Sequence, residues 1–438
     1  FRQIVGEAYT PEAVAKTTGI DAKTILDLAR AFAGAKKPLA ICGRGSGRLP
    51  GGLQEVLAVH YLNALVGSIN QPGGVIAVPE PEYINWPEPE MDPTASKGMQ
   101  QPRVDGAGQG GFSVARYLLN RLPAALSSGS PPPVKALFVS GANPVHHLAD
   151  AGAAAQAFRK IPLIVSLSPF MNETAAMAHF ILPTHTGLER YEDVPAASGF
   201  PRPILGLAKP AVKPLLNTKH VGDVVIELAK AMRRPVAGAF PWADYEDCLK
   251  KTLGGNWGTL VKNGFVVDAK FTPSGFETAS RKFEFKNNEL AKLPAYAAQA
   301  APGDERSFPL TLIPYDTMRL AVGAAGTPPF LMKALEETVL QQNDGMVEIN
   351  PATAGGLGLV EGAVAVLSTP RGRARVRVHL FDGIMPGLVA MPRGLGHSAF
   401  DRFLAGKGVN INDLIAPVED PASGFEAGWG IRAQLTRA

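Results

Sequence analysis

Three stretches of the chain share one pattern, in which a short apolar run stops at a polar turn and a helical segment follows. The apolar runs cover residues 38–42, 134–139 and 163–167, and the first two end in the glycine-containing turns 43–47 and 140–144. An apolar run bounded in this way is typical of a buried strand. Strands that alternate with helices form parallel sheets, in which the turns at the carboxyl ends of the strands face ligands. The pattern therefore predicts a nucleotide-type α/β layer.

The pattern changes at Phe308, after which short runs with alternating valines are separated by glycine and proline. Many short strands with few helices favour a closed β-barrel, because closure leaves no unpaired edge. We expect strands at residues 310–313, 346–349, 363–368, 374–379 and 387–391.

The chain divides into five segments on this basis. Residues 72–133 are rich in Pro, Gly and Ser, and we expect an extended excursion there. Residues 195–215 hold many prolines and are expected to cross between elements, while residues 240–307 alternate only weakly. The predicted organisation is an α/β domain in two parts, 1–71 and 134–300, interrupted by the excursion 72–133, then a linker at 301–307 and a barrel at 308–438.

Composition excludes several kinds of function. The net charge of +4 over 438 residues is too small to indicate nucleic-acid binding. No apolar run approaches the ~20 residues that span a bilayer, so we expect no direct membrane span. Cys42 and Cys248 are the only cysteines, and two cannot supply the roughly four ligands of an iron–sulfur cluster. A disulfide between them stays open. The chain begins at Phe1 without a methionine, and we expect an N-terminal part to lie outside it.

Short phrases in a fixed order carry a family resemblance over about residues 9–436. Each phrase is weak alone, but their order is distinctive, and the chain resembles the dimethyl sulfoxide reductase family of molybdopterin oxidoreductases. The phrases are YTPE at 9–12, LAICGRG at 39–45, LNALVGSIN at 62–70, GANP at 141–144, NETA at 172–175, ILP at 181–183, LERYE at 188–192, INP at 349–351, PRG at 370–372, GLGH at 394–397 and NIN at 410–412.

The resemblance implies a parallel-sheet, dinucleotide-type α/β domain followed by a C-terminal double-psi β-barrel. In the family these two regions flank a bis-molybdopterin guanine dinucleotide, while the iron–sulfur cluster and the molybdenum ligand come from an N-terminal third that this chain lacks. The positions that correspond to cofactor contacts, whether retained or vestigial, are Gly43, Gly45, Asn143, Ser168, Glu173, Thr174, Arg319, Arg371, His397 and Asn410. No catalytic residue and no metal ligand is predicted.

Simpler interpretations compete with these roles. Gly43 and Gly45 could let a phosphate approach the backbone, but a tight strand-to-helix turn explains them better, since the spacing is not the dinucleotide fingerprint. Asn143 could bind a guanosine through its amide or form an Asx turn before Pro144.

Other polar groups favour structural roles. Adjacent His146 and His147 should point apart and hold no metal. The alternating arginines at 371–377 should share one face of a strand, either a solvated sheet edge or a surface for an anionic partner. The acidic turn 189–193 lacks an accompanying base or nucleophile and is interpreted as structural.

The most informative departure from the family is Ser168. The family usually has an aspartate there, which binds guanine through charge-assisted hydrogen bonds that a serine cannot match. His179 likewise replaces an acidic residue, and a satisfied histidine at a helix end is the favoured interpretation. In the segment 315–319, only Thr317 and Arg319 echo the arginine–histidine–threonine phrase of cofactor-binding relatives. These departures favour a chain that binds no cofactor.

Three functional hypotheses follow from the resemblance. The favoured one is a cofactor-free scaffold of the polysulfide-reductase-like group, in a menaquinone-reducing membrane complex of anaerobic respiration. The phrases LERYED and SPFMNETA, and an end after the barrel without a fused ferredoxin domain, favour that type. The second hypothesis is a catalytic subunit that binds bis-molybdopterin guanine dinucleotide, and the third is a free-standing small-molecule-binding module.

The favoured hypothesis implies particular partners and a location. An iron–sulfur subunit, a multihaem cytochrome c and an integral membrane quinone-binding subunit would carry the clusters, haems and quinone site. This chain would be held by them on the periplasmic side of the inner membrane.

Overall fold

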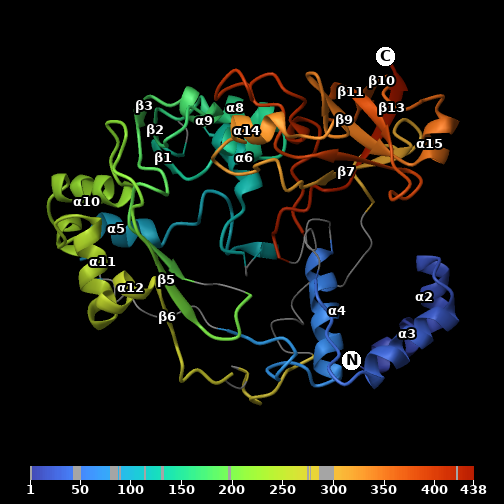
Figure 1. Cartoon of the computed structure of the whole chain (residues 1–438), viewed down its shortest axis with the longest axis horizontal. Helices are drawn as coiled ribbons and strands as arrows, with labels where there is room; N and C mark the ends of the chain where they lie inside the picture. The colour runs from blue at the N-terminus through green and yellow to red at the C-terminus, as the bar shows by residue number, and fades with distance from the viewer. Residues whose placement is uncertain are drawn as a thin grey trace.

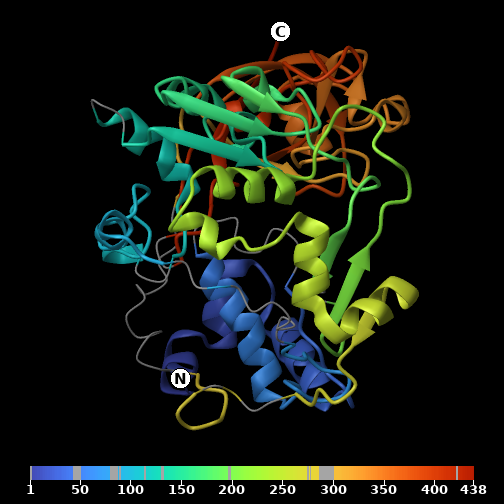
Figure 2. The same cartoon turned by 90° about the vertical axis from the view of Figure 1, so that its left-hand side faces the viewer.

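The α/β layer and the barrel lie next to each other in the computed structural model, and the N-terminal helices lie below both (Figures 1 and 2). The described residues are 2–42, 51–78, 87, 90–112, 115–129, 133–195, 199–273, 276, 278–285, 300–420 and 423–438.

The α/β layer contains a parallel sheet in the order β1-β2-β3. Each strand of this sheet is short, and the central strand is buried because it carries Ile164, Val165 and Leu167. Helix α6 packs against α8, and Leu126 and Phe158 join Ile164 in the core beneath the sheet. The predicted strand, turn and helix order is therefore confirmed in this layer. The bounds are β1 Ala136–Ser140, β2 Leu163–Leu167, β3 Phe180–Leu182, α6 Leu122–Ser127, α7 Pro144–His147, α8 Ala151–Phe158 and α9 Glu173–Ala176.

The C-terminal region forms a closed six-stranded barrel, as predicted. Strand order runs β11-β10-β13-β7-β12-β9, and a further pairing of β9 with β11 closes the ring. The pairs β7–β12 and β9–β11 are parallel, and the other barrel pairs are antiparallel. The last strand, β13, was not predicted from the sequence. The bounds are β7 Leu310–Tyr315, β8 Leu340–Gln341, β9 Asp344–Ile349, β10 Val364–Ser368, β11 Arg373–Leu380, β12 Leu388–Pro392 and β13 Ile431–Arg437.

Closure corrects one prediction about the arginine-rich strand. Arg373, Arg375 and Arg377 do share the outer face of β11, while Val376 and Val378 face the core. However, β11 is hydrogen-bonded to β10 on one side and β9 on the other, so it is not a sheet edge.

A third sheet corrects the expectations for residues 195–215 and 240–307. Strands β4, β5 and β6 form an antiparallel sheet, and Leu205 and Leu207 of β5 pack against Leu249 and Leu260. Prolines near residue 200 disfavoured a strand in the sequence interpretation. In β5, however, buried Leu205 and Leu207 alternate with less buried residues, as in an ordinary strand. The bounds are β4 Glu192–Pro195, β5 Ile204–Ala208, β6 Phe265–Val267, α10 Val221–Ala231, α11 Tyr245–Leu253 and α12 Trp257–Asn263.

The N-terminal region also departs from the prediction. Thr10 and Asp21 cap α2 and α3 through their side chains, as expected. The apolar run 38–42, expected to be a strand, is irregular, and the Asn63 side chain satisfies both backbone groups of Ala40 at 2.9 and 2.8 Å. The turn 43–47, with Gly43 and Gly45, lies outside the described residues. The bounds are α1 Arg2–Ala8, α2 Pro11–Thr18, α3 Ala22–Gly34 and α4 Gly52–Leu65.

The described residues of the excursion 72–133 are more regular than predicted. They contain α5 (Pro93–Met99), two 3-10 turns and α6, which packs against α8. Cys42 and Cys248 are both free, so the possible disulfide is not formed. Among the described residues, no helix combines the length and apolarity that crossing a bilayer demands.

Candidate functional site

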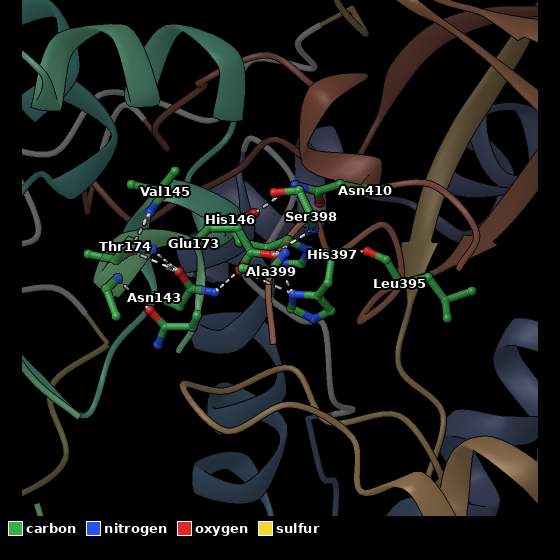
Figure 3. A network of polar contacts seen from close by, with 12 residues as sticks. Asn143, Val145, His146, Glu173, Thr174, Leu395, His397, Ser398, Ala399 and Asn410 are labelled. Carbon is green, nitrogen blue, oxygen red and sulfur yellow. Dashed lines mark hydrogen bonds and ion pairs between the residues drawn. The ribbon is translucent and has the colours of Figure 1, made fainter. Parts of the chain in front are cut away.

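A buried carboxylate joins the α/β layer to the barrel. Glu173 is the first residue of α9, directly after the Asn172 cap, and only 8% of its side chain is exposed. Its oxygens accept hydrogen bonds from Asn143 Nδ2 at 2.7 Å and from the backbone N–H groups of Ser398 and Ala399 at 2.8 and 3.1 Å. His397 Nδ1 lies 3.1 Å from the same carboxylate (Figure 3). The barrel loop that carries residues 397–399 is thus tied to the start of α9.

Asn143 and Thr174 extend this network within the α/β layer. Asn143 is fully buried, and its Oδ1 accepts from Thr174 N and Oγ1 at 3.1 and 2.8 Å. The Thr174 hydroxyl in turn accepts from Val145 N at 3.2 Å. The Asx turn considered for Asn143 is not formed, because its side chain reaches across to α9 and caps no backbone group of α7.

His146 supplies the second half of the junction. Its ring stacks on that of His397, with centroids 3.8 Å apart and planes 9° from parallel. His146 Nε2 lies 3.1 Å from Leu395 O, and the His146 carbonyl accepts hydrogen bonds from the side chains of Asn410 and Asn412. We refer to Asn143, His146, Glu173, His397 and Asn410 as the junction cluster.

The histidine pair differs from the sequence-based expectation. The rings of His146 and His147 do not point apart but meet edge to face, with centroids 5.2 Å apart. They belong to α7, a helix of only four residues. Within the described part of the chain, no group of three or more His, Cys, Asp or Glu side chains is arranged to hold a metal ion.

The electrostatics of the junction cluster favour an ionised Glu173 beside a neutral His146. Burial works to raise the pKa of Glu173, but hydrogen bonds from His397 and Asn143 outweigh it and hold the pKa well below the ordinary range. Burial lowers the pKa of His146 to about 3, helped by repulsion from His397 and His147. Burial, with repulsion from His397 and Arg393, lowers the pKa of His147 to about 4.

These shifts predict an acid-sensitive fold. Between pH ~6.5 and ~4 the unfolded histidines bind protons while folded His146 and His147 stay neutral, so the free energy of unfolding should fall as the pH drops. Glu173 adds a further loss below the unfolded glutamate pKa of ~4.3, because the unfolded carboxylate then takes up a proton while folded Glu173 stays ionised.

Urea unfolding at pH 7, 6 and 5 would measure this dependence. Replacing His146 with glutamine should reduce the slope by up to one proton, or about 1.4 kcal/mol per pH unit. If the free energy of unfolding of His146→Gln depends on pH as steeply as that of the wild type, the lowered pKa of His146 is contradicted.

Ser168 lies apart from the junction cluster, at the carboxyl end of β2. Its hydroxyl donates to Phe170 O at 2.9 Å and accepts from Phe170 N at 3.1 Å, so it closes a local turn. It lines a cavity of about 690 Å³ at the carboxyl ends of the parallel strands, together with Gly141, Arg190, His220 and Tyr245.

The polar walls of this cavity are largely paired with other protein groups. Arg190 makes an ion pair with Glu192 at 2.8 Å, and the Tyr245 hydroxyl donates to Asp193 at 2.6 Å. His220 Nδ1 accepts from Gly222 N at 2.8 Å.

The remaining predicted residues lie elsewhere. Arg319 donates to Ala334 O at 2.6 Å and pairs with Glu336, whereas Arg371 pairs with Asp150. The structure brings together Asn143, Glu173, Thr174, His397 and Asn410, and it leaves Ser168, Arg319 and Arg371 outside that group. His179 accepts a hydrogen bond from Ile164 N at 2.9 Å, as expected of a satisfied histidine.

Sequence reasoning missed the participation of His146 and Asn412. His146 was weighed only as a metal ligand, and Asn412 only as part of the phrase at 410–412. The signal available was that Asn143 and His146 are separated by a single helical turn.

Comparison with known families identifies the fold and its relatives. The molybdopterin oxidoreductase family model matches residues 4–231, and the molybdopterin dinucleotide binding domain model matches residues 332–427.

The chain belongs to the molybdopterin oxidoreductase family.

Individual relatives of this molybdopterin oxidoreductase chain include respiratory proteins. It is 32% identical, over its whole length, to the menaquinone reductase molybdopterin-binding-like subunit of Nitratidesulfovibrio vulgaris, covering 58% of that protein. It is 25% identical over 95% of its length to the arsenate respiratory reductase molybdopterin-containing subunit of Chrysiogenes arsenatis, covering 60% of it. The chain thus spans about three-fifths of these curated relatives.

A solved structure shows the same fold. Acetylene hydratase from Pelobacter acetylenicus superposes with a TM-score of 0.76 at 22% identity, over 98% of this chain and 65% of that one. The family descriptions point to a molybdopterin cofactor. The polar groups of this chain fit that group poorly, because Asn143, Glu173 and Ser168 already have protein partners.

Proposed function

We propose that this chain is a molybdopterin-type subunit of a membrane-associated respiratory oxidoreductase complex, in which it acts as a scaffold and binds no molybdenum cofactor. The complex would pass electrons to the quinone pool, as the name of the menaquinone reductase relative suggests. An iron–sulfur subunit, a multihaem cytochrome c and an integral membrane quinone-binding subunit would carry the redox groups. The chain would lie on the periplasmic side of the membrane.

This proposal is supported mainly by one observation: the polar groups at the carboxyl ends of the strands are already hydrogen-bonded to other groups of the protein. A guanine would require free, charge-assisted partners at the position of Ser168, but that hydroxyl is engaged with Phe170. Asn143 has no exposed surface, and both its amide atoms are bonded to α9 residues. Displacing such partners would leave buried polar groups unsatisfied, which costs about 1–3 kcal/mol each.

A catalytic subunit with bis-molybdopterin guanine dinucleotide, of the polysulfide or thiosulfate reductase type, is the second candidate. The cavity of about 690 Å³ at the carboxyl ends of β1, β2 and β3 favours it, since ligands of open α/β sheets bind at that edge. In that case the residues around Ser168, Arg190 and His220 would hold the nucleotide end, and the group would supply the redox chemistry.

Elemental analysis of the purified complex separates the two candidates. The scaffold proposal expects molybdenum and tungsten far below one atom per chain, and no pterin released on acid denaturation and oxidation. The matched control is a molybdenum-containing reductase purified from the same cells, which excludes a failure of cofactor supply. A stoichiometric metal and pterin in the complex would establish the second candidate instead.

A further inference from the structure

The parallel sheet β1-β2-β3 is covered on one face and exposed on the other. Leu137 and Ile164 are paired in register and point to the covered face, where they pack with Leu126 of α6 and Phe158 of α8. In Figure 1, α6 and α8 lie between the sheet and the barrel, so the opposite face of the sheet is turned away from the barrel. We refer to this opposite face as the outer face.

The outer face carries large apolar side chains in one row. Phe138 of β1 is paired with Val165 of β2, and Val165 is paired with Phe180 of β3, so the three side chains lie side by side. Val165 is buried between its neighbours, but Phe138 and Phe180 are 49% and 62% exposed, and Leu182 on β3 is 38% exposed. All-parallel sheets occur almost only with both faces covered. The outer face is therefore expected to be covered in the assembled protein.

The edge of the sheet at β1 is unpaired as well. Within the described residues, the sheet ends at β1, and the backbone of Ala136–Ser140 makes no hydrogen bond except those to β2. At the other edge, β3 leads into Thr184, which forms a parallel bridge with Lys219. β1 contains no charged residue and no proline, two features with which proteins protect an exposed edge strand. Its sequence thus suits a strand that is paired on both sides.

The direction of winding predicts what covers the outer face. The connections from β1 to β2 and from β2 to β3 cross the sheet in one direction, and right-handed crossovers in one direction place their helices on one face. Both α8 of the first connection and Met177 of the second lie on the covered face. Helices reach the other face when strands are added in the opposite direction, outward from β1, as in doubly wound sheets. The free edge and the exposed face thus fit the same missing unit, a strand followed or preceded by a helix.

We propose that a strand–helix unit of the same protein, formed by polypeptide beyond these 438 residues, completes this sheet. Its strand pairs with β1, and an apolar stripe of its helix lies on Phe138, Phe180 and Leu182. The curated relatives contain enough additional polypeptide for such a unit, because this chain spans only about three-fifths of them. The inference depends on the sheet alone and holds for either candidate function.

Photo-cross-linking in the complete protein, purified with any partner subunits, tests this contact. The photoreactive residue benzoylphenylalanine would replace Phe138, and mass spectrometry would identify the cross-linked peptides. We expect cross-links to a segment of the same polypeptide outside these 438 residues, with no gain in the mass of the subunit on a denaturing gel. The matched control places benzoylphenylalanine at Phe381, directly after β11, which is 45% exposed and should not cross-link to that segment.

Amide hydrogen exchange of the same preparation tests the pairing of β1. The internal control is β6, which is also an edge strand among the described residues and carries Phe265, 54% exposed. We expect peptides that cover β1 to exchange at least about tenfold more slowly than peptides that cover β6, because hydrogen bonds on both sides protect a strand.

Three outcomes would overturn the proposal. They are a cross-link from position 138 to a partner subunit or to a second copy of the chain, the absence of any cross-link from that position, and exchange in β1 as fast as in β6. Neither measurement depends on molybdenum or pterin content, so failure of the scaffold proposal is distinguishable from failure of this one.

Discussion

Replacing Glu173 with alanine is expected to lower the free energy of unfolding by about 3 kcal/mol or more. The carboxylate accepts from Asn143, Ser398 and Ala399 and lies against His397, and its side chain is 8% exposed. Removing it leaves the buried Asn143 amide and two backbone N–H groups without an acceptor, and an unsatisfied buried donor costs more than a lost pair. Urea denaturation at pH 7 would measure the loss.

A second carboxylate–imidazole pair on the barrel provides the control. Glu361 accepts from Leu380 N and lies 3.2 Å from His379 Nδ1, but its side chain is 55% exposed. Glu361→Ala should therefore lower the free energy of unfolding by less than about 1 kcal/mol. If the two alanine substitutions lowered the free energy of unfolding equally, Glu173 would not join the α/β layer to the barrel as described.

Substituting Gly396 with alanine is expected to destabilise the chain by about 3 kcal/mol or more. Gly396 has φ +75°, and a Cβ there would lie 1.8 Å from Asn410 N and 2.3 Å from Val409 C. The overlap is with backbone, so relief requires moving either the loop that carries His397 or the segment that carries Asn410. Both segments belong to the junction cluster, and its contacts would be lost with the movement.

A substitution at Gly406 is the control that separates the effect of steric overlap from the effect of backbone strain. It has nearly the same φ, +72°, but a Cβ there would meet nothing within 4 Å. Gly406→Ala should thus show only the strain of a left-handed alanine, about 1–2 kcal/mol. Thermal unfolding of both variants would give the comparison, and a Gly396→Ala protein as stable as Gly406→Ala would contradict the predicted overlap.

Local patterns in the sequence predicted the regular elements where burial and turn chemistry agree. Strand β2 matched its predicted bounds because its apolar run is flanked by a proline and a polar turn. The family resemblance led to the correct architecture, including the barrel, whose closure depends on pairings between distant strands that periodicity cannot specify.

The failures have physical causes too. Residues 38–42 look like a buried strand, but the Asn63 side chain supplies the hydrogen bonds that a neighbouring strand would have given to Ala40. β13 was missed although its pattern is regular: Ile431, Ala433 and Leu435 face the core and polar residues alternate with them. Candidate site residues could be proposed by position in the family phrases, but their partners could not. The bond from Asn143 to Glu173 spans 30 residues, and the contact from His397 to Glu173 spans 224.

The matching of donors and acceptors around Glu173 has a consequence for how such a subunit is made. If the chain binds no cofactor, as proposed, the hydrogen bonds that Asn143, Ser398 and Ala399 donate to Glu173 would join the α/β layer to the barrel from this polypeptide alone. The two parts would then associate equally well in cells starved of molybdenum.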